Sequence, residues 1–467
     1  MPSFNGRFYR IPTVAISTNT TQLTSFGLAP GGVVAMLGSA TGGIPNTVQR
    51  FTDPESAQTA FRGGDLVTAA QLAWQHGAQV IYMTRIGSAL QSSATITGAA
   101  SSDIATITSK DYGSYTIGIQ YKVEAGTVSG NKFTVKLYDS LTNRTTIESI
   151  DNAANIGEVA TYFNTTLPST LVTITTTSSA SSASLVGYTS LTGGSDGSPV
   201  TADWSTGLAL YNTQFVNIMH PAGSSDETVH ALFKTHVETY SNQKRERTAI
   251  VGSPANPVIG DINTAGSLVA RAYNLNSERV VLVAPGTDEQ SGAFTAAKVV
   301  GIVAQNDVAT PVTYKTISAT SIDTKYSESE KETLIQAGVL VVEEVPQGRR
   351  IVRGITTVQD PSQSVEDPFK EYSIVRIKDY ITDNVRTILE TTYIGKKGIS
   401  GVTSQMQSTV ASVLGKLKEA QIIVGYQNIV VNQDVNNPQV FTITYQVAPV
   451  SPVNFIFVTQ YLVNALS

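Results

Sequence analysis

The residues of this sequence best suited to chemistry lie in a glycine-rich segment, Gly-Gly-Ser-Asp-Gly, at positions 193–197. The segment fits G-x-S-x-G, in which a serine nucleophile occupies a sharp turn between a strand and a helix. In that arrangement the helix follows the turn directly, whereas Ser198, Pro199 and Val200 intervene here. Gly and Asp are also the usual residues of tight turns. The pattern therefore favours a turn over a hydrolase nucleophile at Ser195, although both interpretations stay open.

The other sequence patterns that could support catalysis, metal binding or phosphate binding are incomplete. The chain has 4 His and no Cys. His230 and His236 lie six residues apart on an expected helix, about 240° around its axis, so they cannot share a metal ion. The lysines that follow Gly395 and Gly415 lack the other residues of a phosphate-binding loop. We therefore expect no enzymatic activity, no catalytic, cofactor-binding or metal-binding residue, and no cofactor.

The amino-acid composition limits the kinds of molecule that the chain can bind. A net charge of −5 gives no basis for direct binding to nucleic acid. Charged residues make up only 14% of the chain, against about 25% in ordinary soluble domains. Two explanations stay open, a surface largely buried against neighbouring copies and an exterior of solvated Ser, Thr and Asn. No apolar run is long enough to cross a membrane and the N-terminus lacks signal-peptide features, so we expect no membrane insertion and folding in the cytoplasm.

The elements that would position any site begin with an alternation of strands and helices. The short apolar runs at 31–40 and 79–86 are typical of buried strands, and residues 65–77 between them of a helix. Strands and helices alternate again after the glycine-rich segment. This pattern predicts an α/β main domain, residues 25–90 and 198–365, whose mostly parallel sheet is covered by helices.

Three further parts flank or interrupt that domain. Residues 1–24 are polar with scattered apolar positions, which predicts an extended arm. Residues 91–197 combine many Ser and Thr with short alternating runs, which predicts a small, inserted, β-rich outer domain without helices. Apolar residues at helical spacing over 371–395, a second helix over 403–420 and terminal strands predict an α+β C-terminal domain, residues 366–467.

The order of these segments resembles the tail sheath proteins of contractile bacteriophages and related injection machines. The similar pieces run from an opening strand and Gly/Pro loop to the terminal apolar segment, and the insertion and outer arms are not diagnostic. The pieces are residues 33–61, 79–86, 190–199, 281–286, 294–307, 351–358, 391–398 and 447–463.

The resemblance implies a structural role. Such subunits stack as six-fold rings in a helical sheath around a tail tube, assemble in a metastable extended state, and contract to drive the tube through the host envelope without nucleotide hydrolysis. The implied partners are other copies of the chain, the tail tube protein, and baseplate and tail terminator proteins. The implied location is the virion tail, assembled in the cytoplasm of the host bacterium.

The resemblance also implies site residues. In this family arms from both chain ends add strands to the sheet of a neighbour. The corresponding residues are Ile11, Val14 and Ile16 in the first arm and Val440, Phe441, Ile443, Tyr445 and Val447 in the augmenting strand, for which an ordinary strand within one chain is the alternative. The C-terminal domain would face the tube through Lys396, Lys397, Lys416 and Lys418, although lysines at helix ends also satisfy the helix dipole.

Two other functions stay open at this point. One is an α/β hydrolase that uses Ser195. The other is a receptor-binding or adhesin module, suggested by the β-rich segment 91–197.

Overall fold

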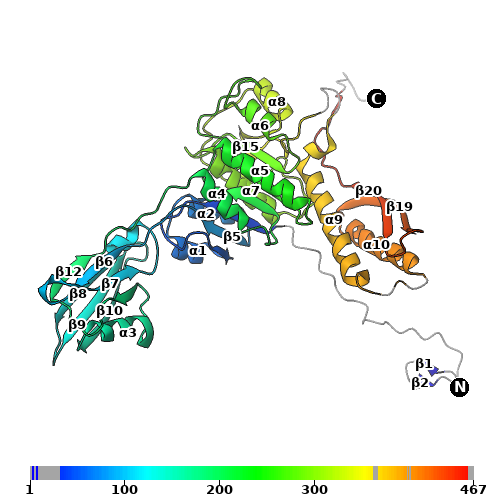
Figure 1. Cartoon of the computed structure of the whole chain (residues 1–467). Helices are drawn as coiled ribbons and strands as arrows, with labels where there is room; N and C mark the ends of the chain where they lie inside the picture. The colour runs from blue at the N-terminus through cyan, green and yellow to red at the C-terminus, as the bar shows by residue number, and fades with distance from the viewer. Residues whose placement is uncertain are drawn as a thin grey trace. The chain divides into compact units, whose positions relative to one another are not determined.

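The computed structural model describes residues 3–4, 7–8, 32–360, 366–396, 398 and 401–460 (Figure 1). Residues 1–30 form a unit of their own, in which β1 (Ser3–Phe4) and β2 (Arg7–Phe8) make an antiparallel hairpin. The predicted arm residues Ile11, Val14 and Ile16 lie outside the described residues. Residues 31–467 form the second unit, to which all other contacts below belong.

A nine-stranded mixed sheet is the centre of the second unit. Its order is β16-β18-β17-β15-β14-β13-β3-β5-β4, and the six strands from β17 to β5 run parallel. The edge strands β4, β18 and β16 pair antiparallel, so the sheet is mixed and not only parallel. The strands are β3 (Val34–Gly38), β4 (Val48–Phe51), β5 (Ile81–Arg85), β13 (Ile218–Pro221), β14 (Thr248–Gly252), β15 (Val280–Ala284), β16 (Thr316–Ile317), β17 (Val339–Val345) and β18 (Gly348–Ile351).

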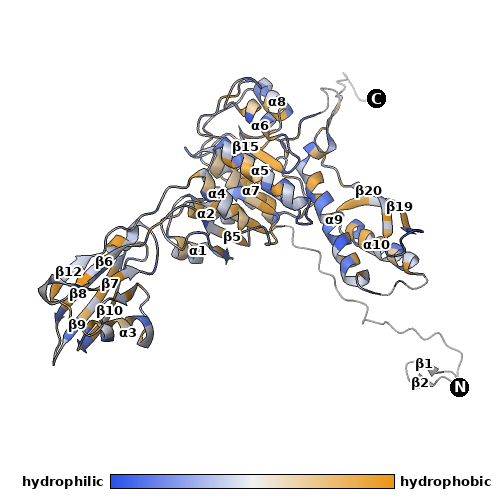
Figure 2. Ribbon diagram, viewed as in Figure 1, coloured by the Kyte–Doolittle hydropathy of each residue, from blue (hydrophilic) through white to orange (hydrophobic). Residues whose placement is uncertain are grey.

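Helices cover both faces of this sheet. Because successive strand residues point to opposite faces, Met36 packs into the cluster that holds α2 and α7, and Leu37 into the cluster that holds α4, α5, α6 and α8. This double burial explains why the central strands are mostly apolar (Figure 2). The helices are α1 (Pro54–Phe61), α2 (Asp65–Gln75), α4 (Thr201–Ala209), α5 (Glu227–Ser241), α6 (Leu268–Leu275), α7 (Gly292–Gln305) and α8 (Glu328–Gln336).

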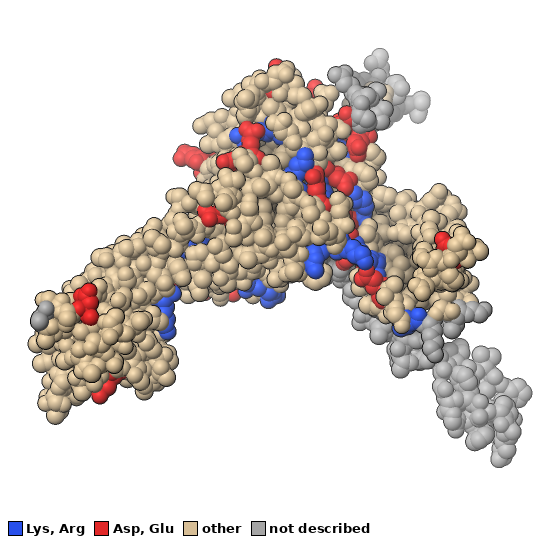
Figure 3. Space-filling model, viewed as in Figure 1, with Lys and Arg blue, Asp and Glu red and all other residues tan. Residues whose placement is uncertain are grey.

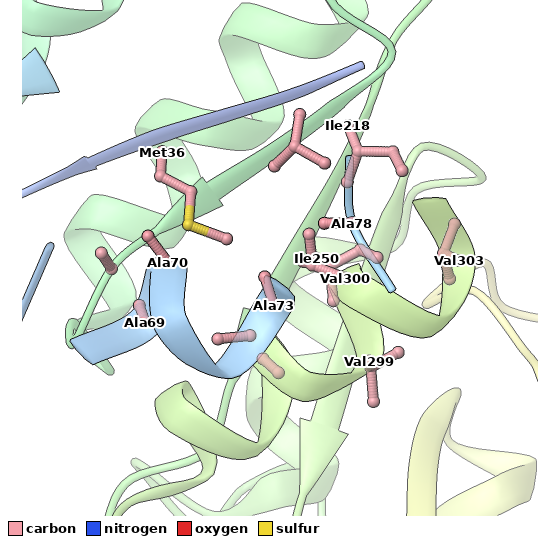
Figure 4. Close-up of a cluster of buried hydrophobic side chains, with 14 of the residues drawn as sticks. Met36, Ala69, Ala70, Ala73, Ala78, Ile218, Ile250, Val299, Val300 and Val303 are labelled. Atoms are coloured by element: carbon pink, nitrogen blue, oxygen red, sulfur yellow. The ribbon is translucent and has the colours of Figure 1, made fainter. Parts of the chain in front are cut away.

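Helices α2 and α7 approach each other closely because small residues line their contact. Ala69, Ala70 and Ala73 of α2 face the cluster that also holds Val300 of α7 (Figure 4). A Cβ built on Gly301 would lie 2.3 Å from the carbonyl oxygen of Ala73. The backbone of α7 therefore fits against α2 only without a side chain at this position.

We expect Gly301→Ala to lower the free energy of unfolding by about 1–3 kcal/mol, the usual cost of overpacking a core. Gly415→Ala is the matched control, because Gly415 also lies inside a helix and a Cβ there has no closer neighbour than the Tyr426 hydroxyl at 3.6 Å. The control should gain up to about 1 kcal/mol from helix propensity. Urea unfolding of both variants measures the difference, and equal stabilities would contradict the close approach.

The predicted insertion has a hydrophobic core of its own, drawn only from residues 96–191. Two antiparallel sheets enclose it, of order β10-β9-β8-β12 and β11-β7-β6. The strands are β6 (Ser93–Thr97), β7 (Asp103–Ser109), β8 (Gln120–Ala125), β9 (Asn131–Asp139), β10 (Arg144–Ala153), β11 (Val172–Thr176) and β12 (Val186–Ser190).

The expectation of an all-β insertion is wrong in one respect. A short helix, α3 (Ile156–Thr161), continues as a wider turn over Tyr162–Thr166. Asn155 caps it by accepting from the Glu158 amide, and the Glu158 carboxylate accepts from the amide of Ala154. This Asn-x-x-Glu cap is a recognised start signal that the Ser/Thr-rich surroundings concealed.

The C-terminal part contains both predicted helices, α9 (Tyr372–Tyr393) and α10 (Val402–Glu419), followed by the hairpin of β19 (Ile423–Gln433) and β20 (Phe441–Pro449). The apolar stripe of α9 packs against α10 and one face of the hairpin. A further strand was expected over residues 453–463; its described part, 453–460, pairs with no strand among the described residues. No helix of the described ranges is long and apolar enough to cross a bilayer. The four domain boundaries remain predictions.

Candidate interaction surfaces

The place where an open α/β sheet usually binds a ligand is filled in this protein. That place is the crevice at the carboxyl ends of the strands where the strand order reverses, here between β3 and β13. A Cβ on Gly38 would lie 2.9 Å from the Ala222 Cβ, and one on Gly223 would lie 2.4 Å from the Asp65 Cβ. Ser39 also donates to the Asp65 carboxylate at 3.1 Å. Backbone and small side chains therefore leave no room for a ligand there.

The serine of the glycine-rich segment lies in a turn and not at a nucleophile elbow. The backbone of Ser195 pairs with Leu90, and its hydroxyl accepts from the Gly197 amide at 3.3 Å. Helix α4 begins only at Thr201, and no histidine of the described residues bonds to the Ser195 hydroxyl. The hydrolase interpretation is wrong, because the segment closes the insertion.

Three histidines have structural roles inside the protein. His220 Nδ1 bonds to the carbonyl of Ile250, His230 Nε2 to the carbonyl of Ser224, and His236 Nε2 accepts from Arg247 at 3.1 Å. Within the ranges that the structure describes, no group of three or more His, Asp or Glu side chains could hold a metal ion. Burial lowers the pKa of His220 and His230 to about 4 and that of His236 to about 3.

These three pKa values predict a loss of stability in mild acid. An unfolded histidine takes up a proton near pH 6.5, whereas the folded protein keeps His220, His230 and His236 neutral until about pH 4 or 3. Between those limits the unfolded state binds more protons, so the free energy of unfolding falls as the pH falls. Each histidine contributes on the order of 3 kcal/mol. Urea unfolding at pH 7.5 and pH 5 measures this, and equal stabilities would contradict it.

A buried arginine joins the insertion to the main sheet. Arg85, at the end of β5, is fully buried and donates to the carbonyls of Gly43, Tyr112 and Asp196 at 2.8, 3.2 and 2.9 Å. The carboxylate of Asp196 lies 3.9 Å away and accepts from Ser114. Two of the three carbonyls lie within 91–197, so Arg85 holds the loop at Tyr112 and the last residues of that segment. Nothing in the sequence marked this residue, because a single Arg at the end of an apolar strand carries no pattern.

A row of ion pairs holds α9 against loops of the α/β part. Asp379 pairs with Arg279 through two bonds of 2.7 and 3.0 Å, and further pairs follow along the helix. Figure 3 shows positive and negative side chains interspersed in this region, while most of the visible surface is uncharged. The other pairs are Lys378–Glu278, Arg386–Glu246 and Lys244–Glu390. Although charged residues make up only 14% of this chain, several of them pair along α9.

The β19–β20 hairpin has two open edges. It forms a two-stranded sheet, so neither outer edge pairs with another strand among the described residues (Figure 1). One face, which includes Tyr426, Ile443 and Tyr445, packs against α9 and α10. The other face is exposed, with 64% of Val424 and 45% of Val430 accessible. Open edges of this kind accept additional strands.

The segment after β20 exposes an unusual run of apolar side chains. Between 68% and 94% of each of Val453, Phe455, Ile456, Phe457 and Val458 is accessible. The segment is held at its start, where the Asn454 side chain donates to Glu371 at 2.8 Å. Contiguous apolar exposure of this kind marks an interaction site.

The predicted linking residues have a different arrangement. Phe441, Ile443, Tyr445 and Val447 alternate on the half-buried face of β20, and their strand pairs with β19 within the chain. Val440 lies in the turn before β20. The exposed segment 453–458 is the better candidate for a donated strand. Its signal in the sequence was an apolar run with no expected partner strand in the same chain.

The predicted tube-facing lysines are only partly described. Lys396 is exposed just after α9, and Lys416 and Lys418 are exposed in the last turn of α10. Lys397 lies outside the described residues.

The described residues thus present two unpaired strand edges and an exposed apolar segment. Two family models match this sequence: the phage tail sheath protein central domain over residues 197–357, and the phage tail sheath C-terminal domain over residues 364–463. Together they cover more than half of the chain. The chain belongs to the phage tail sheath family.

Relatives with similar sequences are also tail sheath proteins. The chain is 32% identical over 287 residues to the tail sheath protein of Bacillus phage SP01, covering 59% of this chain and 48% of that protein. It is 29% identical over 259 residues to that of Staphylococcus phage Twort, covering 53% of this chain and 42% of that protein. The chain thus spans about half the length of the curated relatives it matches. These relatives are structural proteins, which confirms the expectation that the chain is not an enzyme.

Solved structures show the same fold. A sheath tail protein from Desulfitobacterium hafniense superposes with a TM-score of 0.69 at 14% identity, covering 94% of this chain and 100% of the other. The helical sheath of the anti-feeding prophage in its contracted state gives a TM-score of 0.56 at 10% identity, covering 97% and 99%.

Proposed function

We propose that this protein is the structural subunit of a contractile tail sheath. The observation that carries the proposal is the exposed segment 453–458 in a chain whose β19–β20 hairpin has open edges. The segment is an extended apolar run that pairs with no described strand, and the hairpin has no outer strands among the described residues. When copies of the chain join, the segment of one copy can pair with an outer edge of the hairpin of another.

Burial of apolar side chains favours donation of segment 453–458 to another copy of the chain. Burying an apolar side chain the size of Val, Ile or Phe contributes about 1.5–3 kcal/mol. The five exposed side chains of the segment therefore offer on the order of 10 kcal/mol as an upper limit, before the cost of ordering is subtracted. Added strand hydrogen bonds would supply direction and register. The bond between Asn454 and Glu371 holds the start of the segment beside the N-terminus of α9.

As the resemblance described above implies, copies of the chain form six-fold rings stacked in a helical sheath around a tail tube. The sheath lies between baseplate and tail terminator proteins in the virion tail. The extended sheath is metastable and contracts without nucleotide. The filled crevice at the carboxyl ends of β3 and β13 supports this, because a motor driven by a bound ligand would need that space. The first arm, with Ile11, Val14 and Ile16, would add a second strand to the same hairpin.

Electron microscopy of the purified chain tests this proposal. We expect long tubes of stacked rings at high protein concentration or on addition of tail tubes, and shortening of extended tails without any nucleotide. Discrete particles under all these conditions would contradict a sheath and leave the adhesin alternative.

The tube-facing lysines supply a separate prediction. Changing Lys396, Lys416 and Lys418 together with Lys397 to Glu should leave the fold intact and weaken assembly on tail tubes. Exposed ion pairs contribute only about 0–1 kcal/mol each, so several must act together and can be released in sequence. Lys234, Lys244, Lys315 and Lys325, changed in the same way, are the control of equal charge. Extended tails formed equally well by both variants would contradict this assignment.

A further inference from the structure

The outer face of the four-stranded sheet β10-β9-β8-β12 is basic and aromatic. The register pairs Lys136 with Gln120, Thr134 with Lys122 and Lys132 with Glu124. These residues alternate with the buried side chains of β8 and β9, so they face away from the core. Three lysines therefore project from adjacent strands on one side of the sheet.

A tyrosine from the neighbouring strand lies among these lysines. The Nζ atoms of Lys136 and Lys122 lie 3.6 and 5.6 Å from the centre of the Tyr188 ring. Tyr188 is 45% exposed, so part of its ring stays accessible. Tyr138 and Ile147 extend the same face and are 59% and 61% exposed. This face thus combines aromatic surface with ammonium groups.

The charge of this face opposes that of the whole chain. Glu124 is the one carboxylate among these paired residues, and it is shared by Lys122 at 2.5 Å and Lys132 at 3.7 Å. Lys136 makes no ion pair with any described residue and rests on the tyrosine ring instead. The Asp151 carboxylate on β10 also lies within electrostatic reach of Lys132, so one positive charge remains in excess, in a protein whose net charge is −5.

We propose that this face binds a linear polyanionic polysaccharide, a chain of sugars that carries repeated sulfate, carboxylate or phosphate groups. Lys132 and Lys136 are four residues apart on β9, which corresponds to about 13 Å along the strand. Lys122 lies on the adjacent strand, about 5 Å across. The ammonium groups pair with the anionic groups, and the Tyr188 ring offers a flat apolar surface to a sugar ring.

A single face of this kind binds weakly, because exposed charges are screened by salt. The interaction becomes strong when many copies engage one polymer chain at once. The inference does not depend on the proposed function, because the face belongs to one chain and can be tested on it.

The test is binding of the purified full chain to immobilised dextran sulfate, with neutral dextran as reference, over a series of salt concentrations. We expect binding to dextran sulfate only, falling as salt rises. The variant Lys122→Gln, Lys132→Gln, Lys136→Gln should bind at least about tenfold more weakly. The control variant Lys234→Gln, Lys244→Gln, Lys325→Gln removes the same charge, including two lysines that also form ion pairs, and should stay within about twofold of the unchanged chain.

A second variant separates the aromatic contribution from charge. Tyr188→Ser should weaken binding several-fold while leaving its salt dependence unchanged, and circular dichroism verifies that each variant is folded. The proposal is overturned if the unchanged chain ignores dextran sulfate, if neutral dextran binds equally well, or if both triple variants lose binding alike. Tighter binding to single-stranded DNA or to an acidic protein than to dextran sulfate would also overturn it, and would assign the face to that partner.

Discussion

A chain that ends after Val450 will fold normally and fail to form tubes. The segment removed includes the exposed residues 453–458, whose described contacts with the rest of the chain include the bond between Asn454 and Glu371 and the approach of the Arg353 guanidinium to the Phe455 ring. Removing it costs the folded subunit few contacts but deprives a neighbouring hairpin of its added strand. Sedimentation and electron microscopy should show monomers at concentrations at which the full chain polymerises.

Two point variants make this prediction sharper. Phe457→Asp places a charge in the donated strand, and Val128→Asp places the same charge on a side chain of similar exposure, 87% against 94%. Both should unfold within about 0.5 kcal/mol of the unchanged chain, as surface substitutions usually do. Only Phe457→Asp should abolish assembly. Tubes formed by the truncated chain, or equal assembly of the two point variants, would contradict the role of the segment.

Arg85→Met will destabilise the protein by about 3–5 kcal/mol. The substitution leaves three carbonyls without their charged donor in a buried site, and removing one partner of a buried charged network has this magnitude. Urea unfolding, followed by the fluorescence of Trp204 beside the sheet, measures the change.

Arg50→Met is the matched control, because Arg50 is exposed on β4 and should cost less than about 0.5 kcal/mol. Limited proteolysis adds a second readout. Cleavage near the ends of the insertion should accelerate in Arg85→Met and not in the control. A loss below about 1 kcal/mol, with unchanged proteolysis, would show that Arg85 does not join the two parts.

The sequence predicted those elements whose pattern is local. The spacing of Ile377, Ile381, Val385 and Ile388 identified α9, because one helix face carries the whole signal. The central strands were predicted from apolar runs, which result from burial on both faces. The edge strands β4 and β18 were missed, since their partners lie across loops and their residues are only half buried.

The candidate surfaces were harder to predict than the fold. The apolar alternation of Phe441, Ile443 and Tyr445 was correctly recognised as a strand, yet Ile443 and Tyr445 pack on α9 and α10 of the same chain. An alternating apolar pattern shows that one face of a strand is buried, but it does not show whether the same chain or another chain covers that face. The exposure of Phe457 and the burial of Arg85 follow from tertiary packing, so neither was visible in the sequence.

The central claim is that copies of this chain are joined by donated strands. A helical reconstruction of assembled tubes by cryo-electron microscopy tests it most directly. We expect residues 453–458 of each subunit to lie as a strand along an outer edge of the β19–β20 hairpin of a different subunit. Tubes in which that segment stays on its own chain, with both hairpin edges still unpaired, would contradict the account.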